Sequence, residues 1–124
     1  DMAYKLVCYD GRPVMKLSEG KIYRPGSKQV FRLMDTAGMF SRDVIGTEDE
    51  EPLGGTHLLA DVMAVGSRIA PSPSLEELRE RFNQDFDRLD RRFKSLTNPP
   101  HYPVAASPKL ERLTARVQES ISTE

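Results

Sequence analysis

Cysteine and histidine are scarce in this 124-residue chain, and their scarcity limits its chemistry. Cys8 is the single cysteine, and the two histidines are His57 and His101. A lone cysteine cannot form an internal disulfide, and neither a CxxC pair nor a Cys/His cluster offers metal ligands. We therefore expect no metal site and a reducing, cytoplasmic environment. Cys8 itself is expected to act as a small buried hydrophobe.

Net charge and long apolar runs are lacking as well. The 18 basic and 19 acidic side chains leave a net charge of −1, so no overall field draws the chain to nucleic acid or to an anionic membrane. No apolar run approaches the ~20 residues that span a bilayer, and no signal peptide is visible. We therefore expect neither nucleic acid nor a membrane as a partner.

The first half of the chain has the pattern of a β-sheet. Side chains alternate over residues 4–9, which predicts a strand. Asp10-Gly11 is a hairpin signal because glycine tolerates the positive φ of a tight turn. We expect a β-rich part over residues 3–66, built as an antiparallel sheet of about four or five strands. The further strands are expected at residues 14–17, 30–34, 39–45 and 57–65.

The second half of the chain has a helical pattern. Leucine and phenylalanine recur at steps of three and four from Leu75 to Leu96, which predicts one continuous amphipathic helix of about six turns. Ser74 and Glu77 form a capping-box pattern at its start. Asn98-Pro99-Pro100 is expected to end it, because proline disfavours a helical residue before it.

A shorter C-terminal helix is expected to complete the fold. Residues 101–106 read as an extended linker or a short strand. Ser107 then caps a helix with Pro108 at its first position, where proline is tolerated. The helical part covers residues 72–122, and the length of the chain fits a single domain, residues 1–124. The fold class predicted by these patterns is α+β.

The loop at residues 18–28 is rich in glycine, proline and basic side chains, and it is open to two interpretations. In the first, Gly26-Ser27-Lys28 turns successive N–H groups toward one point and binds phosphate or carboxylate. In the second, it is a solvated hairpin loop with ordinary lysines. The acidic residues 47–51 lack the spacing of a calcium loop and are expected to form a solvated turn. No serine sits in a nucleophile elbow, so we expect no catalytic residue.

Short motifs occur in order over nearly the whole chain, and the most specific ones lie in its first thirty or so residues. They are Tyr4-Lys5-Leu6-Val7, Asp10-Gly11-Arg12-Pro13, Met15 to Lys21, Pro25 to Arg32, Asp43-Val44-Ile45-Gly46, the acidic run ending in Pro52-Leu53, Pro73-Ser74-Leu75, and Tyr102-Pro103-Val104 before Ser107-Pro108. Together these motifs resemble the C-terminal segment that follows the barrel in nicotinate phosphoribosyltransferase.

The resemblance implies an activity whose catalytic groups lie outside this chain. Enzymes of that family make nicotinate mononucleotide and pyrophosphate from nicotinate and phosphoribosyl pyrophosphate in NAD salvage, with ATP hydrolysis and magnesium. Their catalytic histidine, nicotinate-binding arginine and main phosphate loops lie upstream of the matching segment. The resemblance therefore implies a chain that is inactive alone and holds no cofactor of its own. The partners that it implies are the N-terminal domain and barrel of the same enzyme, and a second subunit in a homodimer.

The resemblance also suggests what the basic loop does. In the related nicotinamide phosphoribosyltransferase, a stretch rich in lysine and arginine approaches the phosphate-binding end of the site from the corresponding place. By that analogy Lys16, Lys21 and Lys28 are candidates for contacts with phosphate or ATP, because polyphosphate substrates require fixed positive charge. Two other functions stay open: a free-standing interaction module that docks a partner by its apolar stripe, and a standalone phosphate-binding protein.

Overall fold

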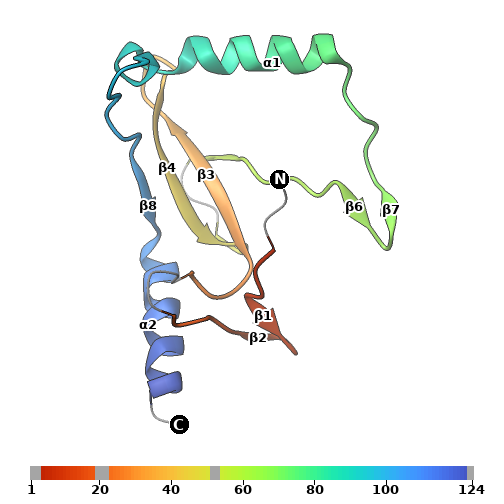
Figure 1. Ribbon diagram of the computed structural model, residues 1–124, viewed down its shortest axis with the longest axis vertical. Helices are drawn as coiled ribbons and strands as arrows, with labels where there is room; N and C mark the ends of the chain where they lie inside the picture. Colours follow the sequence, from red (N-terminus) through yellow and green to blue (C-terminus); the bar gives the residue numbers. More distant parts are fainter. Residues whose placement is uncertain (1–3, 19–22, 51–53, 123–124) are drawn as a thin grey trace.

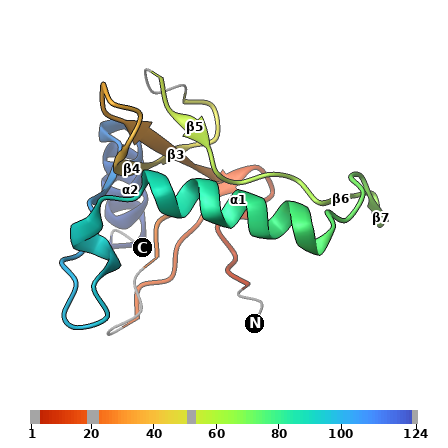
Figure 2. The same ribbon diagram turned by 90° about the horizontal axis from the view of Figure 1, so that it is seen from above.

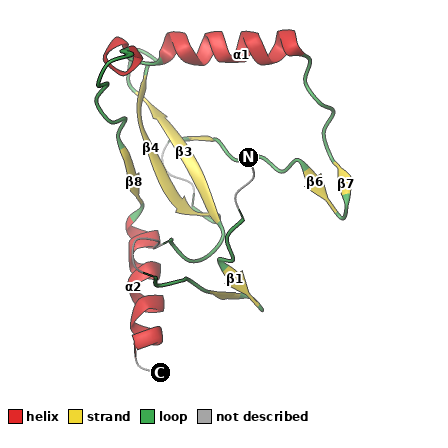
Figure 3. Cartoon of the chain, in the orientation of Figure 1, coloured by secondary structure: helices red, strands yellow, loops and turns green. Residues whose placement is uncertain are grey.

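The structure is a computed structural model that describes residues 4–18, 23–50 and 54–122 (Figure 1). Its helices and strands confirm the α+β class (Figure 3). The elements in chain order are β1 (Cys8–Tyr9), β2 (Arg12–Pro13), β3 (Lys28–Met34), β4 (Phe40–Thr47), β5 (Thr56–His57), β6 (Met63–Ala64), β7 (Ser67–Arg68), α1 (Leu75–Arg88), the 3₁₀ turn η1 (Arg91–Lys94), β8 (Val104–Ala106) and α2 (Pro108–Ser122).

A four-stranded sheet in the order β5-β3-β4-β8 forms the centre of the molecule. β3 pairs antiparallel with β4 from Lys28 opposite Thr47 to Met34 opposite Phe40. β5 pairs antiparallel with the other edge of β3. β8, which lies within the predicted helical part, pairs parallel with β4 because the chain leaves the sheet through α1 and returns in the same direction. The predicted size of the sheet is confirmed, whereas its last pairing is parallel rather than antiparallel.

Three of the predicted strands differ from expectation. The strand expected at residues 4–9 is reduced to β1, and only the ends of residues 57–65 are extended, in β5 and β6. Residues 14–17 form no strand, because the partner of β1 is Arg12–Pro13. β1 and β2 form a separate two-stranded hairpin, and β6 and β7 form another. Both hairpins lie apart from the four-stranded sheet in Figure 1. The turn at Asp10-Gly11 is confirmed, with φ of 48° and 70° at the two residues. Cys8 is exposed, so its predicted burial is wrong: a strand outside the main sheet has no second layer to cover it.

The predicted six-turn helix is divided in two. α1 begins at the predicted capping box, in which Ser74 and Glu77 bond reciprocally, but it ends at Arg88, and Leu89 is extended. The Asp90 side chain then accepts a hydrogen bond from the Arg92 N–H and starts η1. Local bonds of this kind compete with a continuing helix. With 14 residues α1 is not the longer helix, because α2 has 15.

The core is small and lies between the sheet and α2. Phe31 and Leu110 are fully buried, and Met15 and Phe40 are nearly so. Gly46 has no room for a side chain, because an added Cβ would lie 2.9 Å from the Phe31 ring and 2.7 Å from a Glu50 oxygen. α1 contributes no buried residue. The sheet and α2 therefore hold the fold together, and α1 adds little to its core.

Two phenylalanine substitutions, one in the sheet and one in α1, test whether α1 contributes to the core. Phe31→Ala should lower the free energy of unfolding of the 124-residue chain by about 3–5 kcal/mol, because it leaves a cavity at a fully buried position. Phe82→Ala, at a side chain that is 62% exposed on α1, should cost less than about 1 kcal/mol. Urea unfolding followed by circular dichroism measures both. Equal losses of unfolding free energy in the two variants would contradict the conclusion that α1 lies outside the core.

Candidate functional site

The basic loop is tied to the first hairpin by a single backbone carbonyl. The Val7 carbonyl accepts hydrogen bonds from the Gly26 N–H at 2.7 Å and from the Val14 N–H at 2.9 Å. Gly26 has a φ of +79°, which favours glycine. Because the Gly26 N–H is already bonded within the protein, it is not available to an anion, and the predicted backbone nest lacks this donor.

Lys28 closes the same loop with its side chain. Its Nζ donates to the carbonyls of Arg24, at 2.8 Å, and Gly26, at 2.5 Å. Burial lowers the pKa of this ammonium group from its ordinary value. An ammonium group carries three N–H donors, so two bonds to the loop leave one for a ligand. Lys28 is thus a fixed positive charge where the loop enters β3.

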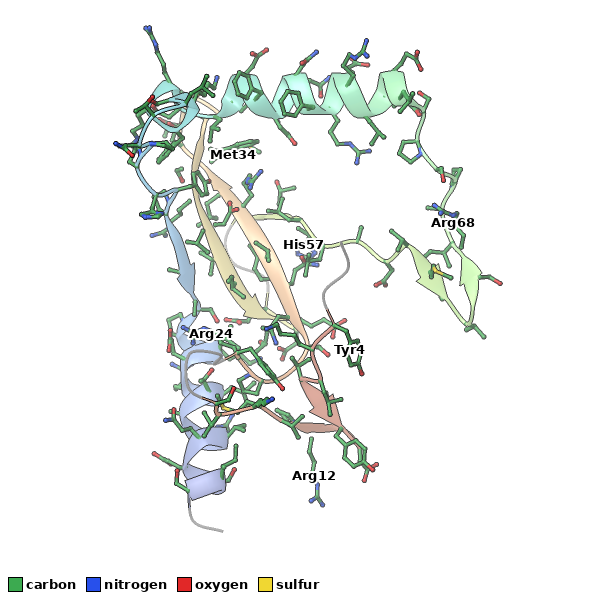
Figure 4. The ribbon with its side chains drawn as sticks, in the orientation of Figure 1. Tyr4, Arg12, Arg24, Met34, His57 and Arg68 are labelled. Carbon is green, nitrogen blue, oxygen red and sulfur yellow. The ribbon has the colours of Figure 1, made fainter. Side chains whose placement is uncertain are left out.

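The other basic residues of the loop differ in their surroundings. Lys16 is exposed next to Met15, which is buried and anchors the backbone there. Lys21 lies outside the described residues. Arg24, labelled in Figure 4, points toward α2 and forms an ion pair with Glu111 at 2.8 Å. Of the three lysines predicted to contact phosphate, the structure therefore places Lys16 at the surface and Lys28 in the loop.

A hollow of about 470 Å³ separates the first hairpin, the basic loop and α2. Its charged lining residues are Glu48, Asp49, Lys109 and Arg116. Lys109 forms an ion pair with Asp49. Lys109 and Arg116 are basic residues that the sequence interpretation missed, although their seven-residue spacing puts them on one face of a helix. The lining of the hollow therefore contains both acidic and basic side chains rather than charges of one sign.

Glu50 joins the acidic turn to α2. One of its carboxylate oxygens accepts hydrogen bonds from the Thr47 N–H at 2.6 Å, the Ser107 hydroxyl at 2.7 Å and the Thr47 hydroxyl at 3.1 Å. Partial burial by itself would raise the pKa of Glu50, but these hydrogen bonds from Ser107 and Thr47 lower it below its ordinary value. The prediction of a merely solvated turn is therefore wrong at Glu50, and Glu51 lies outside the described residues.

Arg32, Asp43 and Tyr102 form a second polar cluster at the opposite end of the sheet. Arg32 donates to both oxygens of Asp43, at 2.9 and 2.8 Å, and the Tyr102 hydroxyl donates to one of them at 3.2 Å. The hydrogen bond to Asp43 raises the pKa of Arg32, and desolvation, followed by the Asp43 charge, raises that of Tyr102. Because the carboxylate and guanidinium satisfy each other, the cluster clamps β3, β4 and the segment before β8 together.

Both histidines lie at the surface of the described part of the chain. His57 is exposed, and its ring meets that of Phe31 edge-on with centroids 5.0 Å apart; Figure 4 labels it on β5. His101 is exposed in the segment before β8. Over residues 4–18, 23–50 and 54–122, no three His, Cys, Asp or Glu side chains gather closely enough to hold a metal ion. In the same ranges no helix has the length and apolarity to cross a membrane.

Comparisons with known proteins agree on one family. The family model described as "Nicotinate phosphoribosyltransferase C-terminal domain" matches residues 55–114. A nicotinate phosphoribosyltransferase of Mycobacterium tuberculosis is 40% identical over the whole of this chain, which covers 27% of that protein. The rat enzyme is 34% identical over 89% of this chain and is covered to 25%.

A solved structure extends the likeness to the fold. The crystal structure of human nicotinic acid phosphoribosyltransferase superimposes with a TM-score of 0.76 at 27% identity, over 96% of this chain and 26% of the human chain. The chain thus spans about a quarter of the length of the relatives that it matches.

The carboxylate of Glu50 makes the stability of the fold depend on pH. Its pKa is lowered in the folded state, so its ionised form stabilises the fold above the ordinary pKa of a glutamate, and this contribution is lost as the pH falls through the lowered value. Glu50→Gln should therefore reduce the drop in unfolding free energy between about pH 7 and about pH 3.5. Glu48→Gln, on the exposed part of the same turn, should leave that drop unchanged. Urea titrations at the two pH values measure it, and an unaltered drop in Glu50→Gln would contradict the assignment.

Proposed function

Because this chain belongs, as a C-terminal domain, to the nicotinate phosphoribosyltransferase family, we propose that it is the supporting lobe of an enzyme that forms nicotinate mononucleotide in NAD salvage. The observation that carries this proposal is the 40% identity to a mycobacterial nicotinate phosphoribosyltransferase over the full length of the chain. The match in fold to the human enzyme supports it independently.

In this proposal the chemistry belongs to the enzyme as a whole. We place the binding of nicotinate, phosphoribosyl pyrophosphate, ATP and magnesium mainly outside this chain, which covers 27% and 25% of two of the relatives. We assign no catalytic role to His57, which is exposed and packs edge-on against Phe31, or to His101, which is exposed before β8. The enzyme is proposed to be cytoplasmic and to work as a homodimer.

The proposed contribution of this chain is positive charge in and beside the basic loop. Lys28 is held by two loop carbonyls. Lys16 is exposed, and its backbone follows directly on the buried Met15. Lys21 lies between them in sequence. Charge-assisted hydrogen bonds to phosphate are strong when the donor is positioned in advance. We assign Lys16, Lys21 and Lys28 to contacts with the phosphates of phosphoribosyl pyrophosphate or ATP.

Because catalysis is placed outside this chain, we expect the isolated 124-residue chain to be inactive. The 124-residue chain, incubated with nicotinate, phosphoribosyl pyrophosphate, ATP and magnesium, should form no nicotinate mononucleotide above background. The full-length polypeptide that carries the chain should form it under the same conditions. Chromatographic detection of the mononucleotide measures both, and turnover by the 124 residues alone would show that the active site has been placed wrongly.

The lysine assignment predicts a defect specific to phosphate substrates. In the full-length enzyme, Lys16→Ala should lower kcat/KM for phosphoribosyl pyrophosphate or ATP by roughly tenfold to a hundredfold, the effect of losing one hydrogen bond to a charged group. KM for nicotinate should change little. Arg42→Ala is the control, because it removes one exposed positive charge opposite Leu33, far along the sheet from the loop. Equal effects of the two variants on kcat/KM would show that Lys16 does not contact the phosphates.

A further inference from the structure

The apolar side chains of α1 face solvent. Leu75, Leu78, Phe82 and Phe86 recur at steps of three and four, so they share one face of the helix, yet they are between 43% and 77% exposed. The Phe82 and Phe86 rings stack on each other with centroids 5.6 Å apart, and none of the residues of α1 is buried. A helix face of this kind is normally packed against another element, so this one lacks its cover.

The exposed apolar surface continues into the segment that leads to α1. Val62, Met63, Val65 and Ile69 of the β6–β7 region are more than half exposed. Figures 1 and 2 agree that β6 and β7 lie away from the four-stranded sheet and that α1 extends beyond it. Exposed apolar patches of this extent mark surfaces that bind other proteins.

A pocket lies where α1 meets the sheet. It has a volume of about 250 Å³, and its lining combines aromatic, leucine and charged side chains. They are Phe82, Asp85, Phe86 and Leu89 from α1 and its end, Arg32 and Phe40 from the sheet, and Tyr102 from the segment before β8. The Arg32 guanidinium lies over the Phe40 ring, 4.5 Å from its centroid. Because Asp43 already satisfies this guanidinium with two hydrogen bonds, the pocket favours an apolar side chain rather than an anion.

The length of the relatives provides a candidate for the cover of this surface. The chain matches 26% of the human enzyme with a TM-score of 0.76. The human enzyme therefore contains this fold together with a remaining part that is nearly three times as long. We propose that the face of α1 docks on that remaining part of the enzyme, with an aliphatic or aromatic side chain of the partner region inserted into the pocket beside Phe40. This inference rests on the proposed function, since it takes the remainder of the enzyme as the occupant.

Labelling of single cysteines tests the docking in the full-length protein. Phe82→Cys and Leu78→Cys place a thiol on the apolar face, and Gln84→Cys places one on the opposite, polar face of the same helix, each in a Cys8→Ser background. Maleimide labelling followed by mass spectrometry gives the rate at each position. In the full-length enzyme we expect labelling at 82 and 78 to be at least about tenfold slower than at 84, and in the 124-residue chain the three rates should be similar.

The outcomes separate this inference from the proposed function. Similar rates at 78, 82 and 84 in a full-length enzyme that forms nicotinate mononucleotide overturn the docking and leave the function standing. Protection of 78 and 82 in a protein without that activity supports the docking and overturns the function. Concentration-dependent protection in the 124-residue chain alone, accompanied by dimers in light scattering, shows that a second copy covers the face and overturns the choice of occupant.

Discussion

The packing of α2 on β4 is the interaction on which the rest of the structure depends. The Ser107 N–H donates to the Ile45 carbonyl at 2.8 Å, and the Ser107 hydroxyl donates to Glu50 and accepts from the Leu110 N–H. One serine thus joins the end of β8, the acidic turn and the first turn of α2. The side chain of Leu110 is buried where α2 meets the sheet. The basic loop adjoins this junction, because Gly26 lies against Leu113 of α2 and Lys28 pairs with Thr47 at the end of β4.

This core also explains why part of the apolar surface of the chain stays exposed. Its buried apolar residues, among those that the structure describes, belong to the sheet, to α2 and to the segments of Met15 and Pro25, whereas α1 and the β6–β7 region expose the kind of side chains that cores contain. A single domain of this length normally buries most of its apolar helix faces. An element that keeps its shape but exposes its apolar face is expected in a lobe of a larger enzyme, and the coverage of the relatives fits that description.

Local signals in the sequence predicted the parts of the fold that depend on few residues. The Asp10-Gly11 turn, the capping box at Ser74 and the helix start at Ser107-Pro108 were all correct, because caps and turns are decided by adjacent side chains. The length of α1 was wrong, since the apolar periodicity continues through Leu89 and Phe93 while the Asp90 side chain turns the backbone. The burial of Cys8 was wrong because pattern alone does not say whether a strand joins the main sheet.

The candidate site was harder to predict from sequence. The motifs placed positive charge in the loop, but they did not show that the carbonyls of Arg24 and Gly26 hold Lys28, or that the Gly26 N–H is bonded to Val7. Lys109 and Arg116 come to line the hollow beside the loop, and Glu50 bonds to Ser107, only through the tertiary contact of α2. Pairings between residues so far apart in sequence leave no periodic signal in a single sequence.

Hydrogen–deuterium exchange of α1 tests the central claim most directly, because it needs no substitution and no activity. The amides of residues 75–88 are followed in the 124-residue chain and in the full-length enzyme, with the amides of β3 and β4 as an internal reference. If the rest of the enzyme covers α1, its amides exchange markedly more slowly in the full-length protein, while those of β3 and β4 are protected in both. Equal exchange of α1 in the two proteins would contradict the view of this chain as a lobe completed by the rest of its enzyme.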